Sequence, residues 1–201
     1  MKSYTQPTLG IVVLAAGFSS RLGHPKALAT VRGKNLLART VQVLAPFAAT
    51  KILVIVPAAA ARYRIGISAG TATFGSNRRR ATGLSSSVRL GIHLSRYNAA
   101  TLLLPVDLVH LSKADVGRLI ARWRGSRRRV AARRIGTGAG TPLVVPHWLY
   151  TKAAQLVGDE GLREVIRRLP PFALSLTDMP SAVTDVDTPD DLERARRRRH
   201  P

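Results

Sequence analysis

One segment, IVVLAAGFSSRLGHPKAL at residues 11–28, constrains the fold more than any other part of the chain. It begins with an unbroken apolar run, Ile11 to Ala16, which predicts a strand buried on both faces. A loop follows that combines glycines and serines with two cations, Arg21 and Lys26, and contains no acid. Glycines let a backbone approach a ligand closely, and α/β proteins hold phosphates outside the carboxyl ends of such strands. The segment therefore predicts an α/β protein with a phosphate-binding loop.

Two common phosphate-binding loops are excluded by their spacing. The P-loop requires G-x-x-x-x-G-K-[ST], but Gly23 is followed by His24 rather than by lysine. The dinucleotide fingerprint requires G-x-G-x-x-G, but Gly17 is followed by Phe18 and Ser19. The pattern present is L-A-A-G-x-S-x-R-x-G-x-P-K, and its structural alternative is an ordinary Gly/Ser-rich surface loop after a core strand.

The rest of the chain alternates between expected strands and helices. Apolar runs predict strands at 51–56, 71–74, 101–106, 129–132, 143–145, 172–176 and 183–186. Helical spacing predicts helices at 36–44, 85–97, from 112 onward, within 156–169 after a turn at Gly158–Gly161, and from 189 onward, with a glycine-rich loop at 136–140. This order is typical of a mostly parallel central sheet with helices on both faces. The 201 residues suit one domain over 1–201, with loose ends at 1–8 and 196–201.

The net charge of +21 raises the question of a nucleic-acid partner. The cations are scattered, no zinc finger or RNP motif is present, and four Phe, four Tyr and two Trp are too few for an obvious base-stacking platform. We therefore favour a cationic surface that attracts anionic substrates, with no dedicated nucleic-acid site. The chain lacks cysteine, a membrane-spanning apolar run and a signal-peptide core, so a cytoplasmic location is expected.

The acids are few, which makes their positions informative. Of 11 acids, only Asp107 and Asp115 precede Asp159. Asp107 follows a buried strand and should lie at the same edge of the sheet as the loop at Gly17, where a carboxylate can hold the hard cation that phosphoryl chemistry uses. The alternative role for Asp107 is to form a turn or a helix cap. Asp115 has capping-box spacing with Ser112, which gives it a structural role.

Four motifs together carry a resemblance to a known family. Besides the first loop, they are Gly83, Ser85, Ser86, Ser87, Arg89 and Gly91; Gly140, Thr141 and Pro142; and D-V-D-T-P-D-D at 185–191. The chain resembles the MobA-like NTP transferase family, in particular its MocA-like group of molybdenum cofactor cytidylyltransferases. The resemblance implies a Rossmann-like nucleotidyltransferase fold. Thr141 stands where the family has His, so recognition of the acceptor departs from the family pattern.

The resemblance also implies roles for individual residues. Serines at the start of a helix can leave backbone N–H groups free for a base or phosphate, although plain capping by Ser85 or Ser86 is the structural alternative. A magnesium ion is implied on Asp107 and Asp187, the latter preferred to Asp185 because it matches the family's second metal-binding acid. The implied catalytic residues are Arg21, Lys26 and Asp107. The implied nucleotide-binding residues are Leu14, Ala15, Ala16, Gly17, Ser19, Arg21, Lys26, Gly83, Ser85, Ser86 and Ser87.

The implied reaction transfers a nucleoside monophosphate from an NTP to a phosphorylated acceptor, with release of pyrophosphate. The family implies molybdopterin as the acceptor, whose phosphate is already ionised, so no general base is required. CTP is expected rather than GTP, because guanylyl relatives tend to have Gly at the position of Ala16 and a methyl group narrows the space beside the base. Two alternatives remain open: a sugar- or polyol-phosphate nucleotidyltransferase, and a non-enzymatic basic protein that binds nucleic acid.

Overall fold

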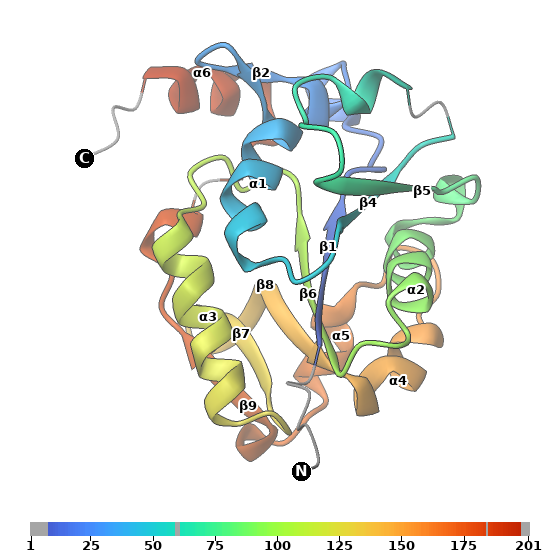
Figure 1. Ribbon diagram of the computed structural model, residues 1–201, viewed down its shortest axis with the longest axis vertical. Coiled ribbons are helices and arrows are strands. Elements are labelled where there is room, and N and C mark those ends of the chain that lie inside the picture. The colour runs from blue at the N-terminus through green and yellow to red at the C-terminus, as the bar shows by residue number, and fades with distance from the viewer. Residues whose placement is uncertain (1–7, 59–60, 184, 198–201) are drawn as a thin grey trace.

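A seven-stranded sheet forms the centre of the computed structural model, which describes residues 8–58, 61–183 and 185–197 (Figure 1). The strands lie in the order β5-β4-β1-β6-β8-β7-β9. Their bounds are β1 (Leu9–Leu14), β4 (Ile52–Val56), β5 (Ala72–Ser76), β6 (Ala100–Pro105), β7 (Val130–Ile135), β8 (Gly138–Pro146) and β9 (Leu174–Thr177). Among these strands only β8 runs antiparallel to its neighbours, β6 and β7, so the prediction of a mostly parallel sheet is confirmed.

The helices cover both faces of this sheet, as predicted (Figure 1). They are α1 (Leu36–Leu44), α2 (Leu84–Leu94), α3 (Lys113–Gly125), α4 (Tyr150–Ala154), α5 (Leu162–Arg167) and α6 (Pro189–Arg197). A small antiparallel hairpin of β2 (Thr30–Val31) and β3 (Lys34–Asn35) precedes α1. Short 3-10 helices connect these elements: η1 (Ser20–Leu22), η2 (Lys26–Leu28), η3 (Ala45–Phe47), η4 (Ala61–Arg64), η5 (Arg80–Thr82), η6 (His147–Leu149), η7 (Pro171–Ala173) and η8 (Pro180–Val183).

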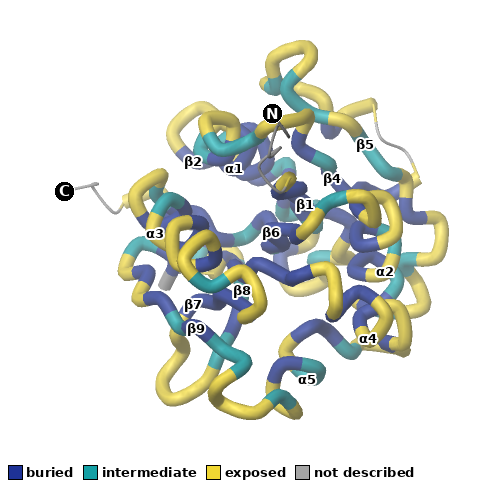
Figure 2. The backbone as a smooth tube through the Cα atoms, turned by 60° about the horizontal axis from the view of Figure 1, so that its bottom comes forward, coloured by how far each residue is buried: buried dark blue, intermediate teal, exposed yellow. Residues whose placement is uncertain are grey.

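The burial of strand β1 on both faces explains why its sequence is an unbroken apolar run. Ile11 and Val13 belong to the core cluster shared with α1, α3 and α6, whereas Val12 belongs to the cluster shared with α2, α4 and α5. Alternate side chains therefore bury on opposite faces, which leaves no solvent-facing position for a polar residue. Figure 2 shows the same contrast across the molecule, with buried strands inside and exposed loops around them.

Two predicted helix caps are present, but one of the acids acts differently from the prediction. The side chains of Asn35 and Ser112 accept hydrogen bonds from the third residues of α1 and α3, at 2.7 and 3.1 Å. Asp115, expected to complete a capping box with Ser112, instead accepts the N–H of Ser181 at 2.9 Å and also contacts the side chains of Ser181 and Arg118. Its side chain is 0% exposed. Asp115 thus fastens η8 to α3 and is unavailable to the cavity described below.

Two local predictions, a loop and a strand, are wrong because tertiary pairing overrides the pattern. The glycine-rich loop predicted at 136–140 is the turn and second strand of a β7–β8 hairpin. The helix predicted within 156–169 after the turn at Gly158–Gly161 is present as α5, and Gly158 adopts a left-handed conformation (φ +55°) in that turn. The strand predicted at 183–186 is absent from the described part of that segment, where Asp185 forms only an isolated antiparallel bridge with Leu108.

The chain ends need one correction. Residues 196–201 were expected to be loose, but α6 includes Arg196 and Arg197, and the Arg196 guanidinium donates to the Thr30 carbonyl at 3.1 Å. Of the ends predicted at 1–8 and 196–201, residues 1–7 and 198–201 lie outside the described residues. Within the described ranges, no helix combines the length and apolar character needed to cross a membrane.

Candidate active site

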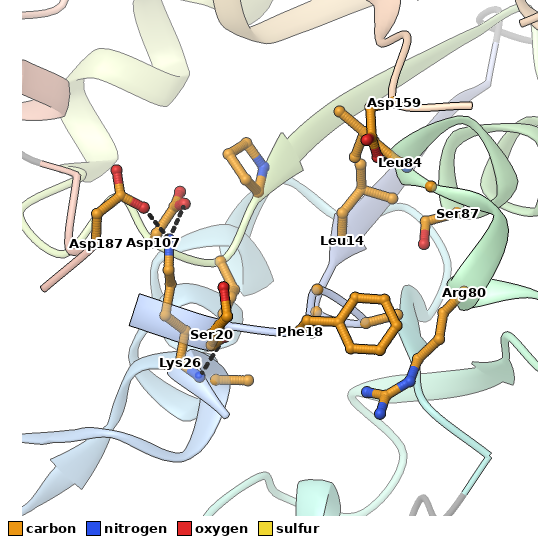
Figure 3. A pocket seen from close by; sticks show the side chains of 18 of the residues that line it. Leu14, Phe18, Ser20, Lys26, Arg80, Leu84, Ser87, Asp107, Asp159 and Asp187 are labelled. Carbon is orange, nitrogen blue, oxygen red and sulfur yellow. Dashed lines mark hydrogen bonds and ion pairs between the residues drawn. The ribbon is translucent and has the colours of Figure 1, made fainter. Parts of the chain in front are cut away.

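A cavity of about 900 Å³ opens where β1 and β6 end and α2 begins (Figure 3). This is the edge of the sheet at which the sequence placed the loop of Gly17 and the carboxylate of Asp107. Of the residues predicted to act at the site, eleven line the cavity: Leu14, Ala15, Ala16, Gly17, Ser19, Arg21, Lys26, Gly83, Ser87, Asp107 and Asp187.

The loop after β1 is folded so that it presents Lys26. Ser19 adopts a left-handed conformation (φ 54°), and its hydroxyl oxygen accepts the backbone N–H of Lys26 at 2.9 Å. Between them Gly23 has φ +76°, a conformation that L side chains rarely adopt. The loop therefore turns back on itself and places the Lys26 side chain against the ends of the strands.

The Lys26 ammonium group joins two carboxylates that are far apart in sequence. Nζ donates to Asp107 Oδ2 at 3.2 Å and to Asp187 Oδ1 at 2.5 Å (Figure 3). Burial of the side chain, which is 16% exposed, lowers the pKa of Lys26, but attraction to Asp107 and Asp187 outweighs this and holds the pKa above its usual value. Lys26 is therefore cationic at neutral pH.

Asp187 reaches this position through two backbone features. The Val186 N–H donates to the Asp107 carbonyl at 3.3 Å, which keeps this segment beside the turn after β6. Just after it, Thr188 and Asp191 form a capping box at the start of α6, with Asp191 Oδ2 accepting the Thr188 N–H at 2.8 Å and the Asp187 N–H at 3.1 Å. Asp191 therefore orients the backbone of Asp187.

Asp185, the weaker metal candidate, lies in the same group of charges. Burial raises its pKa, and the nearby negative charge of Asp107 raises it further, while Arg133 partly offsets the shift. Asp185 does not line the cavity and makes its bridge to Leu108 instead. Of these two acids only Asp187 lines the cavity, and its role as a metal ligand stays a prediction.

Asp107 and Asp187, the two carboxylates at this end of the cavity, fit a divalent cation. Asp107 Oδ1 is buried and has no hydrogen-bond partner in the described structure, so it offers a free lone pair beside Asp187. No group of three or more His, Cys, Asp or Glu side chains suited to a metal occurs among the described residues. Two carboxylates completed by phosphate oxygens and water is the donor set typical of magnesium.

The other end of the cavity is closed by the segment around Gly158. The N–H of Ser85 donates to the Gly158 carbonyl at 3.1 Å, and the N–H of Leu84 donates to Asp159 Oδ1 at 3.4 Å. The expectation that N–H groups are free at the start of α2 is therefore wrong for these two. Gly83 adopts φ +98°, and a Cβ there would lie 2.2 Å from the Gly158 carbonyl oxygen, so this close contact requires glycine.

The three serines of α2 differ in their positions. Ser87 lines the cavity, and its Oγ accepts from the Asn77 side-chain amide at 2.9 Å. Ser86 accepts from the same amide at 2.9 Å and donates to the Gly83 carbonyl at 2.8 Å. Ser85 and Ser86 are not among the residues that line the cavity. Thr141, expected on the acceptor side, lies in β8 and does not line it either.

Sequence reasoning missed several residues of the cavity. The Arg80 guanidinium lies over the Phe18 ring, 4.5 Å from its centroid, at the mouth of the cavity. Asp159 lines the end near α2 and comes from a loop 75 residues away from Leu84. The run Arg78 to Arg80 gave some signal for a basic surface, but no local pattern marked Asp159. The remaining residues that sequence analysis missed are Ser20, Ala27, Ala81, Thr82, Leu84, Pro105 and Val106.

Comparison with known proteins adds a family and a set of similar folds. Residues 11–173 match the family described as MobA-like NTP transferase domain. A search of curated proteins gives no match. Rv0371c from Mycobacterium tuberculosis H37Rv has a similar crystal structure, with 27% sequence identity, a TM-score of 0.74, and coverage of 95% of this chain and 98% of that chain. The same protein in complex with manganese gives 24% identity, a TM-score of 0.72 and the same coverage of both chains.

More distant structures share the fold. Molybdopterin-guanine dinucleotide biosynthesis protein A from Archaeoglobus fulgidus is 14% identical, with a TM-score of 0.72 and coverage of 93% of this chain and 96% of that chain. The 2-C-methyl-D-erythritol 4-phosphate cytidylyltransferase from Thermus thermophilus is 18% identical, with a TM-score of 0.68 and coverage of 94% of this chain and 97% of that chain.

Proposed function

Because the chain belongs to the MobA-like NTP transferase family and is thus a nucleotidyltransferase, we propose that it transfers CMP from CTP to the phosphate of a molybdopterin-type acceptor, releasing pyrophosphate. The choice of the nucleotide base and of the acceptor is the most specific part of the proposal. It follows the MocA-like pattern of the first loop and of D-V-D-T-P-D-D at 185–191.

One observation carries the proposal: Lys26, Asp107 and Asp187 converge on one end of a cavity lined by the loop of Gly17. A triphosphate needs cations to neutralise it and a metal to bridge its oxygens. This end supplies Lys26 and Arg21 as cations and two carboxylates for the metal. We propose magnesium on Asp107 and Asp187, and the manganese complex of Rv0371c supports the use of a divalent metal at this fold.

Catalysis then consists of positioning and charge neutralisation. Magnesium, when bound, supplies positive charge to the α-phosphate and the leaving pyrophosphate. Lys26 has a flexible stem, so its ammonium group can exchange one carboxylate for a phosphate oxygen without leaving the site. Arg21 lies on the turn η1 and lines the cavity. From there its guanidinium group would contact the outer phosphates. The acceptor phosphate attacks the α-phosphorus in line, and no side chain has to remove a proton.

Ala16 supports the choice of CTP over GTP. It is 2% exposed, and its side chain belongs to the core cluster that contains Val88 of α2. Its methyl group therefore fills space beneath the cavity that a glycine would leave to a larger base.

A second candidate is a sugar- or polyol-phosphate nucleotidyltransferase. Thr141 in place of the family's His favours it, because that position lies on the acceptor side in the family. The fold shared with 2-C-methyl-D-erythritol 4-phosphate cytidylyltransferase is compatible with both candidates.

Pyrophosphate release with each of the four NTPs, with and without molybdopterin, tests the proposal. We expect release from CTP that depends on molybdopterin and on magnesium. Asp107→Asn should abolish it, whereas Asp178→Asn, which removes an acid that is 80% exposed and outside the cavity, should not. More efficient use of GTP would overturn the base assignment, and turnover only with 2-C-methyl-D-erythritol 4-phosphate would favour the second candidate. Steep, salt-dependent binding to random duplex DNA without turnover would favour a nucleic-acid-binding protein. A cytoplasmic location remains part of the proposal.

A further inference from the structure

Asp159 places a carboxylate at the end of the cavity remote from Lys26. Figure 3 shows Asp159, Leu84 and Ser87 on one side of the opening and Lys26, Asp107 and Asp187 on the other. One carboxylate oxygen, Oδ1, accepts a long hydrogen bond of 3.4 Å from the Leu84 N–H. The other oxygen, Oδ2, has no hydrogen-bond partner among the residues that the structure describes. Its lone pairs are therefore available to a molecule in the cavity.

Asp159 has no cation bonded to it among the described residues, whereas Asp107 and Asp187 at the other end share the Lys26 ammonium group. A phosphate group at the α2 end would meet this carboxylate, and the N–H groups of Leu84 and Ser85 that could otherwise bind an anion are already bonded. A triphosphate is therefore favoured at the end that holds Lys26 and Arg21. The nucleotide that the proposed function requires then points its base towards Asp159.

Ser87 supplies the complementary group beside it. Its Oγ accepts the Asn77 amide at 2.9 Å, which leaves the hydroxyl hydrogen free to be donated. An ionised carboxylate can only accept hydrogen bonds, so the pair presents one donor and one acceptor to a base. Cytosine has the matching pattern, with acceptors at N3 and O2 and a donor amino group at C4. Uracil carries an N3–H and an O4 acceptor instead, and its O4 would face the carboxylate.

We propose that Asp159 is a specificity-determining residue that accepts a hydrogen bond from the exocyclic amino group of the base and thereby excludes UTP. The inference rests on the proposed function, since it presumes that a nucleotide occupies the cavity. It adds, to the donor hydroxyl of Ser87, an acceptor for the amino group that the first loop does not supply. Ala16 limits the size of the base, whereas Asp159 recognises its amino group, so the two residues select for different properties of the base.

A purely structural role for Asp159 is to cap α2 through the Leu84 N–H. Asp159→Asn separates the two roles, because an asparagine oxygen still accepts that N–H while its amide group can donate to O4 of uracil. The matched control is Asp178→Asn, which removes the same charge from an exposed acid paired with Arg134 outside the cavity.

The test measures the Kd of CTP and of UTP, each with magnesium, by calorimetry for wild type and both variants, together with thermal unfolding. We expect wild type and Asp178→Asn to prefer CTP by about ten-fold or more, and Asp159→Asn to reduce the preference to about three-fold or less with an unchanged melting temperature. An unaltered CTP-to-UTP ratio in Asp159→Asn would overturn the inference while leaving nucleotidyl transfer intact. An equal gain in affinity for both nucleotides would also overturn it, because Asp159 would then only repel phosphate. If wild type bound no NTP, the proposed function itself would fail.

Discussion

The two ends of the cavity are built in different ways. At one end, Lys26, Asp107 and Asp187 meet through charged side chains, and the same atoms can exchange these partners for a phosphate or a metal. At the other end, Gly83 and Gly158 meet through backbone, with no space for even a Cβ between them. The first end is suited to groups that change partners during a reaction, whereas the second holds a fixed shape against which a base can be compared.

The largest effect on activity is expected from removing the ammonium group of Lys26. Lys26→Ala leaves two carboxylates facing each other without a cation and takes away a contact to the triphosphate. We expect kcat/KM for NTP-dependent pyrophosphate release to fall about 100-fold or more while the fold is retained. Lys34→Ala, in the exposed β2–β3 hairpin, is the matched control and should behave as wild type. Unchanged turnover in Lys26→Ala would remove the distinction between the two ends.

Replacing Asp185 and Asp187 one at a time by asparagine tests which carboxylate acts with Lys26 and Asp107 at their end of the cavity. Asp187→Asn should raise the magnesium concentration needed for half-maximal turnover about ten-fold, because it removes one of the two proposed ligands. Asp185→Asn should change it less, since Asp185 lies outside the cavity. A magnesium titration of both variants decides the matter, and the opposite ranking would reverse the assignment.

The end of the cavity formed by Gly83 and Gly158 should be sensitive to the addition of a single methyl group. Gly83→Ala would place a Cβ 2.2 Å from the Gly158 carbonyl oxygen at φ +98°. We expect unfolding free energy to fall by about 1–3 kcal/mol and the Kd for CTP to rise, since the loop that carries Asp159 must move. Gly125→Ala is the control, because its Cβ would meet no atom within 4 Å. Chemical denaturation and calorimetry together would show whether shape and binding are lost in parallel.

A smaller effect should come from the cap that positions Asp187. Hydrogen bonds from the Thr188 hydroxyl and from the N–H groups of Thr188 and Asp187 lower the pKa of Asp191 from 3.8 to about 2. Because this pKa is depressed in the folded state, its contribution to stability is fully present above pH 3.8 and is lost as the pH falls through about 2. The difference in urea midpoint between wild type and Asp191→Asn should therefore be constant near neutrality and shrink below about pH 4. A difference that stays constant down to about pH 2 would contradict this.

The smallest effect is expected at the end of α6, far from both ends of the cavity. Truncation after Ala195 removes the Arg196 bond to the Thr30 carbonyl and the exposed pairs of Arg196 and Arg197 with Glu193. Exposed pairs of this kind contribute little, so maximal turnover should be nearly that of wild type. A large loss of maximal rate would show that the tail takes part in the site.

Local sequence determined the architecture to a large extent. Apolar runs such as Ile11 to Val13 and Leu102 to Leu104 can only be satisfied by burial on both faces, and helical spacing placed α1, α2 and α3 on the sheet. The order of strand, glycine loop and cations placed Lys26 at a sheet edge, and Asp107 followed from its position after a strand. Resemblance to a family then identified the chemistry of these positions.

Tertiary structure decided which distant residues meet. Lys26 lies 81 residues from Asp107 and 161 from Asp187, and Asp159 reaches Leu84 across 75 residues. The antiparallel β8, the buried role of Asp115 and the closed start of α2 likewise depend on segments that pair only after the chain has folded. Periodicity and spacing describe how a residue relates to its near neighbours along the chain. They carry no record of the packing that brings Gly158 against Gly83 and aims a carboxylate into the cavity.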